Sequence, residues 1–298
     1  MDSHTLELFK EHALIPPPDT NDLFRTKRII IDSRDRNTAL YPRPDKYTIR
    51  IDECLEDVVS IELAISDFPF NEYNITVHNN ILHVSTDINA TPDMYESVTI
   101  PQGKYDGEQL ANVIETKINE SFDTLQATIV FDPITSKLTF SGASQFYLNF
   151  KNDTPRQYDI DNVVYDYYRN SIGRVIGFST EVYSVFEPIT APNPVDLRSE
   201  TYIIMHLQRA KVYLSQNNTA NQCFAILRLE NNDKWLSTLN TEPVRKSFNP
   251  PIPDFSVLRF KFSDYYGNAY DFQNKEHRFE LIVKMLKQGR KYTSNFSS

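Results

Sequence analysis

The sequence predicts an all-β fold, a β-sandwich with one small helical insertion, and three observations predict it. Apolar and polar residues alternate along short segments, most clearly in Lys46–Ile51 and Val58–Ser66, a pattern typical of strands with one buried face. Aromatic residues make up 12% of the chain, and flat rings pack well on pleated strands. The chain has 17 Pro but only 7 Gly, so proline-stiffened turns separate the segments.

The first three predicted strands, Lys27–Asp32, Lys46–Ile51 and Val58–Ser66, begin the sandwich. The other predicted strands are Ile81–Ser85, Ser97–Ile100, Gln126–Phe131, Lys137–Phe140, Gln145–Phe150, Tyr202–Leu207, Phe224–Leu229, Val257–Phe262 and His277–Met285. The segment Thr241–Asp254 contains four prolines, so we expect it to be irregular and exposed. Strands at this spacing with proline-rich turns favour a sandwich or a jelly roll.

One helix is predicted to start after Asp106. Asp106 is a good N-cap, and Gln109 three residues later completes the signature of a capping box. Apolar residues at helical spacing follow and form one stripe, which we expect to pack on a sheet: Leu110, Val113, Ile114 and Ile118. With its neighbouring strands, this helix predicts a small α+β unit at about residues 96–151, inserted in one main domain of residues 27–290.

The two ends of the chain are predicted to lie outside that domain. Residues 291–298 form a polar tail. Residues 1–26 are predicted to form an arm that docks on a neighbouring protein, and a disordered tail is the alternative. The arm has apolar side chains that need cover and a proline spacer that holds them away from the first strand. The predicted interface residues are Leu6, Leu8, Phe9, Leu14, Pro16, Pro17 and Pro18.

The charge balance argues against a nucleic-acid partner. Net charge is −9 at pH 7 and the pI is about 5.2, whereas nucleic-acid binding favours a basic face. The best candidates for a local basic patch are Arg34, Arg36, Arg43 and Lys46. Solvated loop charges are the favoured interpretation of these four residues.

The sequence carries no motif for catalysis or cofactor binding. It contains neither a phosphate-binding glycine loop nor a G-x-S-x-G elbow. His78 and His83 could meet across a turn, but Asp87 is the only further ligand nearby, and a zinc site needs more. We therefore expect no enzymatic activity, no cofactor and no bound metal.

The two cysteines, Cys54 and Cys223, are expected to be free thiols. The residues after Met1 are polar, which argues against a signal peptide and for synthesis in the cytoplasm. No stretch approaches the roughly 20 apolar residues of a membrane-spanning helix, so we expect no such segment.

A series of short motifs runs through most of the chain. They are Asp32-Ser33-Arg34-Asp35-Arg36-Asn37, Tyr41-Pro42-x-Pro44, Tyr47-Thr48-Ile49, Val58–Leu63, Phe68-Pro69, Tyr73-Asn74-Ile75, Asn79-Asn80-x-Leu82, Ile100-Pro101-x-Gly103-x-Tyr105, Arg174–Phe178, Ala191–Leu197, Leu258-x-Phe260 and Tyr270-Asp271-Phe272. Each motif is weakly specific, but their order and number resemble the capsid-associated proteins of nucleocytoplasmic large DNA viruses, which include minor capsid and penton (vertex) proteins.

That resemblance implies a single jelly-roll domain and a structural role in the virion. It implies a penton component at the five-fold vertex, present as a homopentamer that contacts the major capsid protein and other minor capsid proteins. Two alternatives stay open: a minor capsid cement or scaffold protein beneath the main shell, and a carbohydrate- or receptor-binding sandwich. Tyr165, Tyr167 and Tyr168 could stack on sugars in the last case.

Overall fold

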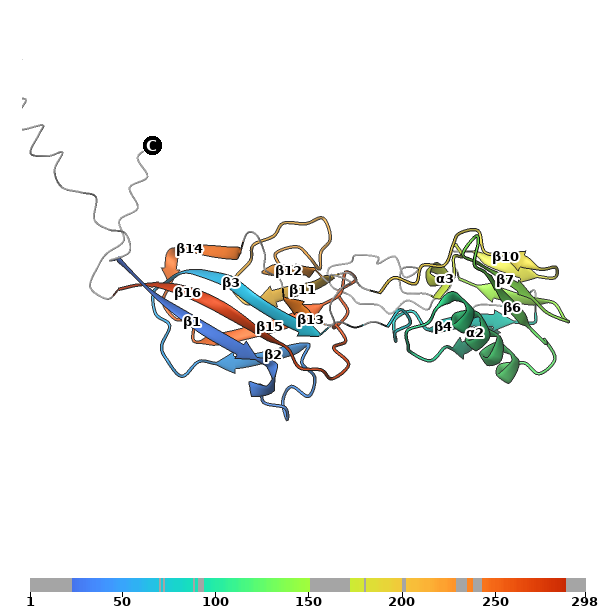
Figure 1. Ribbon diagram of the computed structural model, residues 1–298, viewed down its shortest axis with the longest axis horizontal. Helices are drawn as coiled ribbons and strands as arrows, with labels where there is room; N and C mark the ends of the chain where they lie inside the picture. The colour runs from blue at the N-terminus through green and yellow to red at the C-terminus, as the bar shows by residue number, and fades with distance from the viewer. Residues whose placement is uncertain are drawn as a thin grey trace, which may run out of the picture. The chain divides into compact units, whose positions relative to one another are not determined.

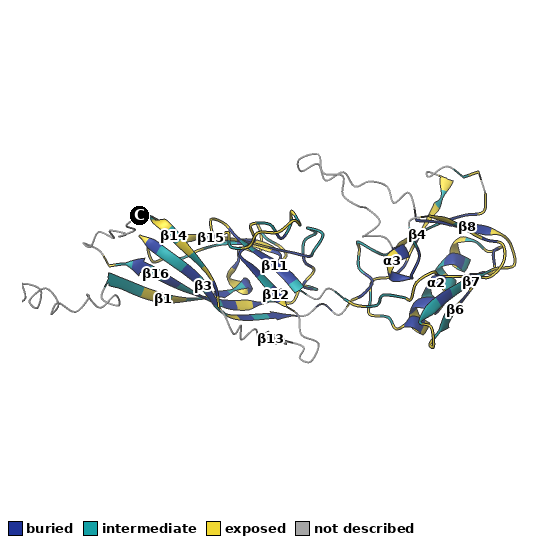
Figure 2. Ribbon diagram, turned by 90° about the horizontal axis from the view of Figure 1, so that it is seen from above, coloured by how far each residue is buried: buried dark blue, intermediate teal, exposed yellow. Residues whose placement is uncertain are grey.

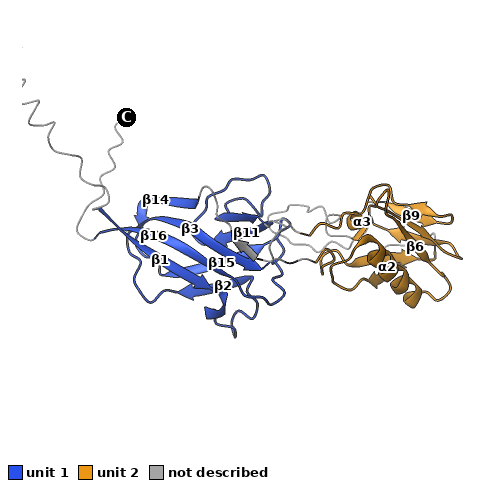
Figure 3. Cartoon of the chain, in the orientation of Figure 1, with its two compact units in different colours: residues 1–71, 200–298 blue, residues 72–199 orange. Residues whose placement is uncertain are grey.

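The computed structural model describes residues 23–287, apart from 70, 72, 88, 91–93, 151–171, 180, 200–201, 229–234 and 238–242. The chain divides into two compact units (Figure 3). Unit 1 consists of residues 1–71 and 200–298, and unit 2 of residues 72–199. Unit 2 is therefore an insertion within the sequence of unit 1.

Unit 1 consists of two antiparallel sheets (Figure 1). Its elements are β1 (Phe24–Asp32), the 3-10 turn η2 (Ser33–Asp35), β2 (Lys46–Arg50), β3 (Val58–Pro69), β11 (Tyr202–Leu207), β12 (Ala225–Arg228), β13 (Trp235–Ser237), β14 (Val244–Ile252), β15 (Val257–Ser263) and β16 (Arg278–Leu286). One sheet has the order β1-β16-β3, with β13 and β14 both paired to β3. The other has the order β12-β11-β15-β2.

The strand pairing of unit 1 is that of a jelly roll. A jelly roll is a long antiparallel ribbon rolled up, so the first of its eight strands pairs with the last and the pairing continues inward. Here β1 pairs with β16, β2 with β15, β3 with β14, and β11 with β12. All four pairs of the ribbon are present. The all-β jelly-roll prediction is therefore confirmed, and unit 2 enters between the third and fourth strands of the roll.

The core of unit 1 lies between its two sheets and is rich in aromatic rings. Alternate residues point inward, as the period-two pattern predicts: Phe279, Leu281, Val283 and Met285 of β16 are all buried. Phe260 and Phe262 of β15 meet them from the other sheet. The buried bands along β16 and β3 are visible in Figure 2.

Unit 2 contains two further antiparallel sheets and the long helix. Its elements are β4 (Ile81–Ser85), β5 (Glu96–Thr99), α2 (Gly107–Ser121), β6 (Thr128–Asp132), β7 (Lys137–Ser141), β8 (Phe146–Asn149), α3 (Ile172–Val175), β9 (Val182–Val185) and β10 (Ile189–Thr190). The sheets have the orders β5-β4-β8-β9 and β10-β7-β6. The predicted capping box is confirmed, because Asp106 and Gln109 accept each other's backbone N–H.

Two predicted boundaries differ from the structure. The insertion is larger than residues 96–151, because β4 pairs with β5 and β8, while β9 and β10 pair with β8 and β7. Those partners are far apart in sequence, so alternation alone does not reveal them. The arm also ends earlier than residue 26, because β1 starts at Phe24, opposite Leu286 of β16.

The prediction for the proline-rich segment Thr241–Asp254 is wrong. Most of it forms strand β14, which pairs with β3. Proline is tolerated at sheet edges and bulges because no ladder hydrogen bond is needed there. Pro250 and Pro251 lie where the register with β3 shifts, between Ser247 and Ile252. The prolines therefore mark an irregular edge strand.

Candidate functional site: a polar cluster between two loops of the jelly roll

The charged motif Asp32–Arg36 forms a tight turn directly after β1. Asp32 caps the 3-10 turn η2 by accepting the backbone N–H of Arg34 at 3.0 Å. The Arg34 guanidinium donates to both oxygens of the same carboxylate, at 2.9 and 2.5 Å. These bonds from Arg34 hold the pKa of Asp32 below its usual value. The first pair of charges is therefore satisfied locally.

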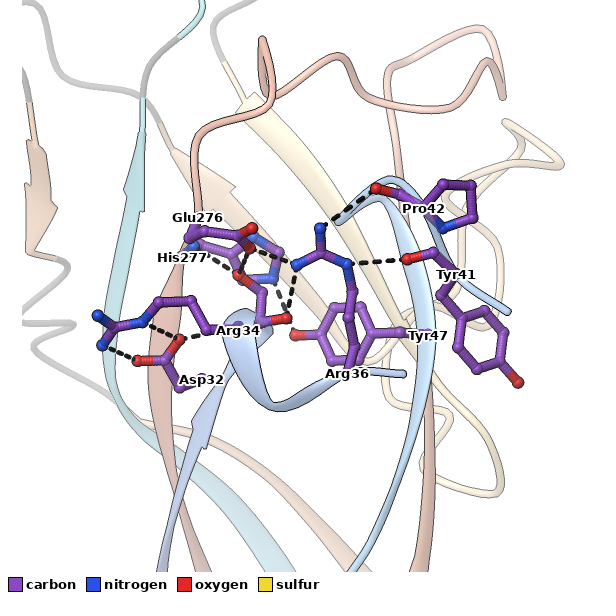
Figure 4. Close-up of polar contacts among 9 residues, drawn as sticks. Asp32, Arg34, Arg36, Tyr41, Pro42, Tyr47, Glu276 and His277 are labelled. Carbon is purple, nitrogen blue, oxygen red and sulfur yellow. Dashed lines mark hydrogen bonds and ion pairs between the residues drawn. The ribbon is translucent and has the colours of Figure 1, made fainter. Parts of the chain in front are cut away.

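Arg36 is the centre of the cluster (Figure 4). Its side chain is only 5% exposed, and it forms an ion pair with Glu276, Nη1 to Oε2 2.5 Å. It also donates to the backbone carbonyls of Ser33, Tyr41 and Pro42, at 2.6, 3.0 and 3.3 Å. One guanidinium thus connects the loop between β1 and β2 to the loop between β15 and β16.

Ser33 and His277 complete that connection. Ser33 donates its backbone N–H to the carbonyl of His277, and the N–H of His277 returns to Ser33 Oγ at 2.8 Å. Ser33 Oγ donates in turn to Glu276 Oε2 at 2.5 Å. Ser33 is fully buried, so these bonds form where water does not compete.

The His277 ring lies inside an aromatic cage. Phe68, Phe262 and Phe272 have ring centroids 4.6 to 4.7 Å from it, and its Nε2 shares a 2.9 Å hydrogen bond with the Tyr47 hydroxyl. Burial, aided by the charge of Arg36, lowers the pKa of His277 to about 3. Burial raises the pKa of Tyr47 well above its usual value. Both rings are therefore neutral at physiological pH.

Serine, histidine and glutamate lie close together here, but not in a catalytic arrangement. A nucleophilic serine needs a histidine ring nitrogen within hydrogen-bond reach to take its proton. Here the bonded ring nitrogen of His277 faces Tyr47, and Ser33 Oγ faces Glu276 and a backbone N–H. With one loop fastened to another by buried bonds, the cluster can hold the end of the sandwich rigid. Its geometry gives no path for proton transfer from Ser33 to the His277 ring.

The sequence identified half of this cluster. The motif Asp32–Arg36 is visible as a run of charges, but its partners Glu276 and His277 lie about 240 residues further on. Nothing in that second segment distinguishes the two residues as partners of Arg36. Only the pairing of the first strand with the last brings the two loops together.

The four candidates for a basic patch separate in the structure. Arg34 pairs with Asp32, Arg36 with Glu276, and Arg43 with Asp45 at 3.1 Å. Lys46 alone of the four lies on a strand, exposed at the start of β2. The interpretation of all four as solvated loop charges therefore holds for Arg34 and Arg43. It is wrong for Arg36, which is a buried structural charge, and Lys46 is exposed but on a strand.

Other predicted sites are placed as follows. The interface residues Leu6, Leu8, Phe9, Leu14, Pro16, Pro17 and Pro18, and the tyrosines Tyr165, Tyr167 and Tyr168, lie outside the described residues. His83 Nδ1 lies 3.1 Å from Ser97 Oγ. Within the described part of the chain, no three His, Cys, Asp or Glu side chains gather as metal ligands. Cys54 is an exposed free thiol and Cys223 a buried one.

A shallow hollow of about 260 Å³ lies on the outer surface of the sheet that contains β1 and β16. The ion pair between Glu62 and Arg245 lines it, and Lys284 Nζ lies 4.2 Å from the centre of the Phe24 ring. Glu62 and Arg245 thus neutralise each other, while Lys284 lies against an aromatic ring. Separately, no helix among the described residues is long and apolar enough to cross a membrane.

Four of the motifs that run through the sequence meet in two pairs in unit 2. Asn74 and Tyr105 exchange hydrogen bonds at 2.7 and 3.1 Å, beside the bridge of Ile75 to Gly103. The N–H of Asn193 donates to the carbonyl of Gly177 at 3.0 Å. Gly177 has a φ of +84°, and a Cβ there would lie 2.1 Å from the Asn193 carbonyl oxygen. These motif residues therefore hold segments of unit 2 together by hydrogen bonds and close backbone packing.

Unit 1 thus belongs to the jelly-roll class of β-sandwiches. The sequence model of a family described as "Family of unknown function (DUF5901)" matches residues 20–213, which is 194 of 298 residues. The chain therefore belongs to this family. No curated protein matches the sequence.

Among solved structures, the chain is similar to the mavirus penton protein, whose crystal structure was determined with selenomethionine. The TM-score is 0.34 and the sequence identity 12%, with 87% of this chain and 99% of that chain covered.

Proposed function

We propose that this chain is a structural protein of an icosahedral virus particle, a penton component that forms a homopentamer at the five-fold vertex. The observation that carries the proposal is the position of the resemblance motifs. Three of the motifs that resemble capsid-associated proteins supply residues that connect parts of this fold: Arg36 connects two loops of the jelly roll, and Asn74 and Gly177 connect segments of unit 2.

The architecture supports a building-block role. Jelly-roll sandwiches are wedge-like and can tile by head-to-tail contacts, which close into a ring when the rotation fits. The same fold also serves positions away from a vertex, so fold alone does not decide between vertex and shell. The sequence resemblance is what favours the vertex over a cement or scaffold position.

An icosahedrally averaged map of the particle tests the position. Five copies of the jelly roll around each five-fold axis are the expected result. Copies found only between the capsomers of the main shell would overturn the vertex and support a cement or scaffold protein. Absence of the chain from purified particles, together with specific binding on a glycan array, would instead favour the carbohydrate-binding alternative.

We also propose that the N-terminal arm docks on a neighbouring capsid protein. Its four apolar side chains, Leu6, Leu8, Phe9 and Leu14, gain roughly 1.5 to 3 kcal/mol each only when they are covered. The test is deletion of residues 1–22, which spares β1 because that strand starts at Phe24. The melting temperature of the isolated protein should stay nearly unchanged while incorporation into particles falls. A large loss of stability would show that the arm belongs to this chain's own core.

A further inference from the structure

The outward face of the second sheet of unit 1 is basic. Outward positions on β2 and β15 alternate with buried ones and carry Lys46, Arg50, Arg259 and Lys261, all exposed. Arg228 is exposed at the end of β12, on the far side of β11 in the same sheet. No outward position on the four strands of this sheet carries a carboxylate. We call the outward side chains of β2 and β15 the basic face.

The strand register places like charges opposite one another on this face. Lys46 of β2 is directly opposite Lys261 of β15, and Lys261 is directly opposite His206 of β11. Like charges directly opposite each other in a sheet destabilise it. Burial, and after it the charge of Lys261, lowers the pKa of His206. Repulsion between Lys46 and Lys261 therefore lowers the stability of the isolated fold. A negatively charged partner bound to this face would relieve that repulsion.

The outward face of the first sheet is different. It carries four basic residues, Arg28, Arg245, Arg278 and Lys284, and three of them pair across strands with Glu280, Glu62 and Asp67. The fourth, Lys284, lies over the Phe24 ring. That face is neutralised by its own carboxylates. Among the described residues, no carboxylate forms an ion pair with Lys46, Arg50, Arg259 or Lys261.

The complementary charge is present in the same chain. Unit 1 has 23 acidic and 23 basic residues and so a net charge of zero, whereas unit 2 has 17 acidic against 8 basic residues and so a net charge of −9. The whole net charge of the protein therefore belongs to unit 2. A positive surface and an acidic body on one chain are complementary between copies.

We propose that the basic face of one copy binds the acidic unit 2 of a second copy of this chain. Such a contact joins two different surfaces, so it is heterologous, and it forms a ring of copies when the rotation between them closes. The contact would hold together the homopentamer of the proposed function. It does not depend on the vertex position, because it predicts association of any two copies of the chain. Because both surfaces lie in water, the contact weakens as salt screens their charges.

Isotope-labelled cross-linking tests the contact directly. Equal amounts of ¹⁴N- and ¹⁵N-labelled full-length protein are mixed at low salt and treated with a carbodiimide, which joins a lysine amine to a carboxylate in contact with it. The expected products are mixed-isotope peptides that link Lys46 or Lys261 to carboxylates within residues 72–199. If those lysines link only within one isotope, the face is covered by the chain's own unit 2, and the proposal is wrong.

Charge reversal provides a second, independent test. The variant R259E/K261E should associate about tenfold more weakly than the wild type in sedimentation velocity at low salt. The matched control, R28E/R245E, makes the same change of charge on the other sheet and should associate like the wild type. Circular dichroism melting checks that both variants fold. Equal loss in both variants, or a wild type that stays monomeric at low salt, would overturn the proposal.

Two other occupants are outcomes of the same experiments. Binding of a DNA duplex or of phosphatidylserine vesicles that R259E/K261E loses and R28E/R245E keeps, without mixed-isotope cross-links, would assign the face to that polyanion instead of to a second copy. A particle map with five copies at each vertex but no cross-link from the basic face would leave the proposed function standing and refute this contact alone.

Discussion

Unit 1 contains two kinds of arginine–carboxylate contact that differ in burial and hardly in geometry. Arg36 to Glu276 and Arg245 to Glu62 are both 2.5 Å long. The two arginines differ in burial, with side chains 5% exposed in Arg36 and 60% exposed in Arg245. Their carboxylate partners differ less and in the opposite sense, with 34% exposed in Glu276 and 13% in Glu62. A buried charge that loses its partner has no water to replace it, while an exposed pair is worth little. The comparison therefore teaches that burial, and not distance, decides what each contact contributes.

The comparison also separates structure from recognition. Asp32–Arg36 is the most charged motif in the sequence, yet its arginines form hydrogen bonds and ion pairs within the loops of unit 1. The basic face has no motif at all, because its residues come one or two at a time from strands far apart in sequence. Charge density in the sequence is thus a poor guide to which charges remain for a partner.

The largest expected effect is that of Arg36→Ala. It leaves three backbone carbonyls without a donor and removes the ion-pair partner of Glu276, whose side chain is 34% exposed. It should lower the free energy of unfolding of unit 1 by about 3 kcal/mol, the low end for a buried pair. Urea unfolding followed by the fluorescence of Trp235, the single tryptophan and part of β13 in unit 1, measures it. Arg245→Ala is the matched control, and equal losses in the two variants would break the comparison.

The class of fold was predictable because apolar and polar residues alternate within the sequence of single strands. Val257–Phe262 and Arg278–Leu286 alternate strictly between outward and buried residues, and the sequence shows that directly. The partners of each strand were not predictable. The register of β1 with β16 joins residues more than 240 apart, and no local pattern encodes it. The true extent of unit 2 was missed for the same reason.

The site was predictable only in part, again for a physical reason. The cap at Asp32 and the turn after it follow from local sequence. The burial of Arg36 does not, because it depends on Glu276 and on the aromatic cage around His277. Strand β14 was missed because proline forbids a central strand but not an edge strand, and the sequence does not show which strand is at the edge.

The next effect is a dependence on pH from His277. Its pKa is about 3 in the folded protein, against a usual value of 6.5. Between pH 6.5 and pH 3, His277 is therefore protonated in the unfolded chain but not in the folded protein. This contribution to stability is complete above pH 6.5 and is lost as the pH falls toward 3, at up to about 1.4 kcal/mol per pH unit. Between pH 6 and pH 4.5 the loss should be about 2 kcal/mol.

Urea midpoints measured at several pH values for the wild type and for His277→Gln isolate this effect. Carboxylates titrate in both proteins, so the difference between the two curves reports His277 alone. The variant should be less stable at pH 7 but should lose less stability between pH 6 and pH 4.5. Parallel curves would show that His277 is protonated in the folded protein, with its positive charge accommodated beside Arg36.

A smaller effect is expected for Ser33→Ala. The substitution removes the hydroxyl that accepts the backbone N–H of His277 and donates to Glu276. Because both Ser33 and His277 are buried, the N–H of His277 is left without a partner, which costs about 1 to 3 kcal/mol. Ser247→Ala, on the exposed face of β14, is the control and should change the urea midpoint little. A larger loss at Ser247 would contradict the assignment.

The smallest effect is predicted for the exposed pair Glu62–Arg245, and a double-mutant cycle measures it. Glu62→Ala, Arg245→Ala and the double variant are compared with the wild type in urea, so that the changes in each side chain's own packing cancel. The coupling energy should be about 0.5 kcal/mol or less, and should fall further at high salt. The Arg36–Glu276 pair in the same cycle should give a coupling several times larger and nearly independent of salt. A coupling for Glu62–Arg245 as large as that of the buried pair would mean that the short distance, not the burial, sets the energy of these contacts.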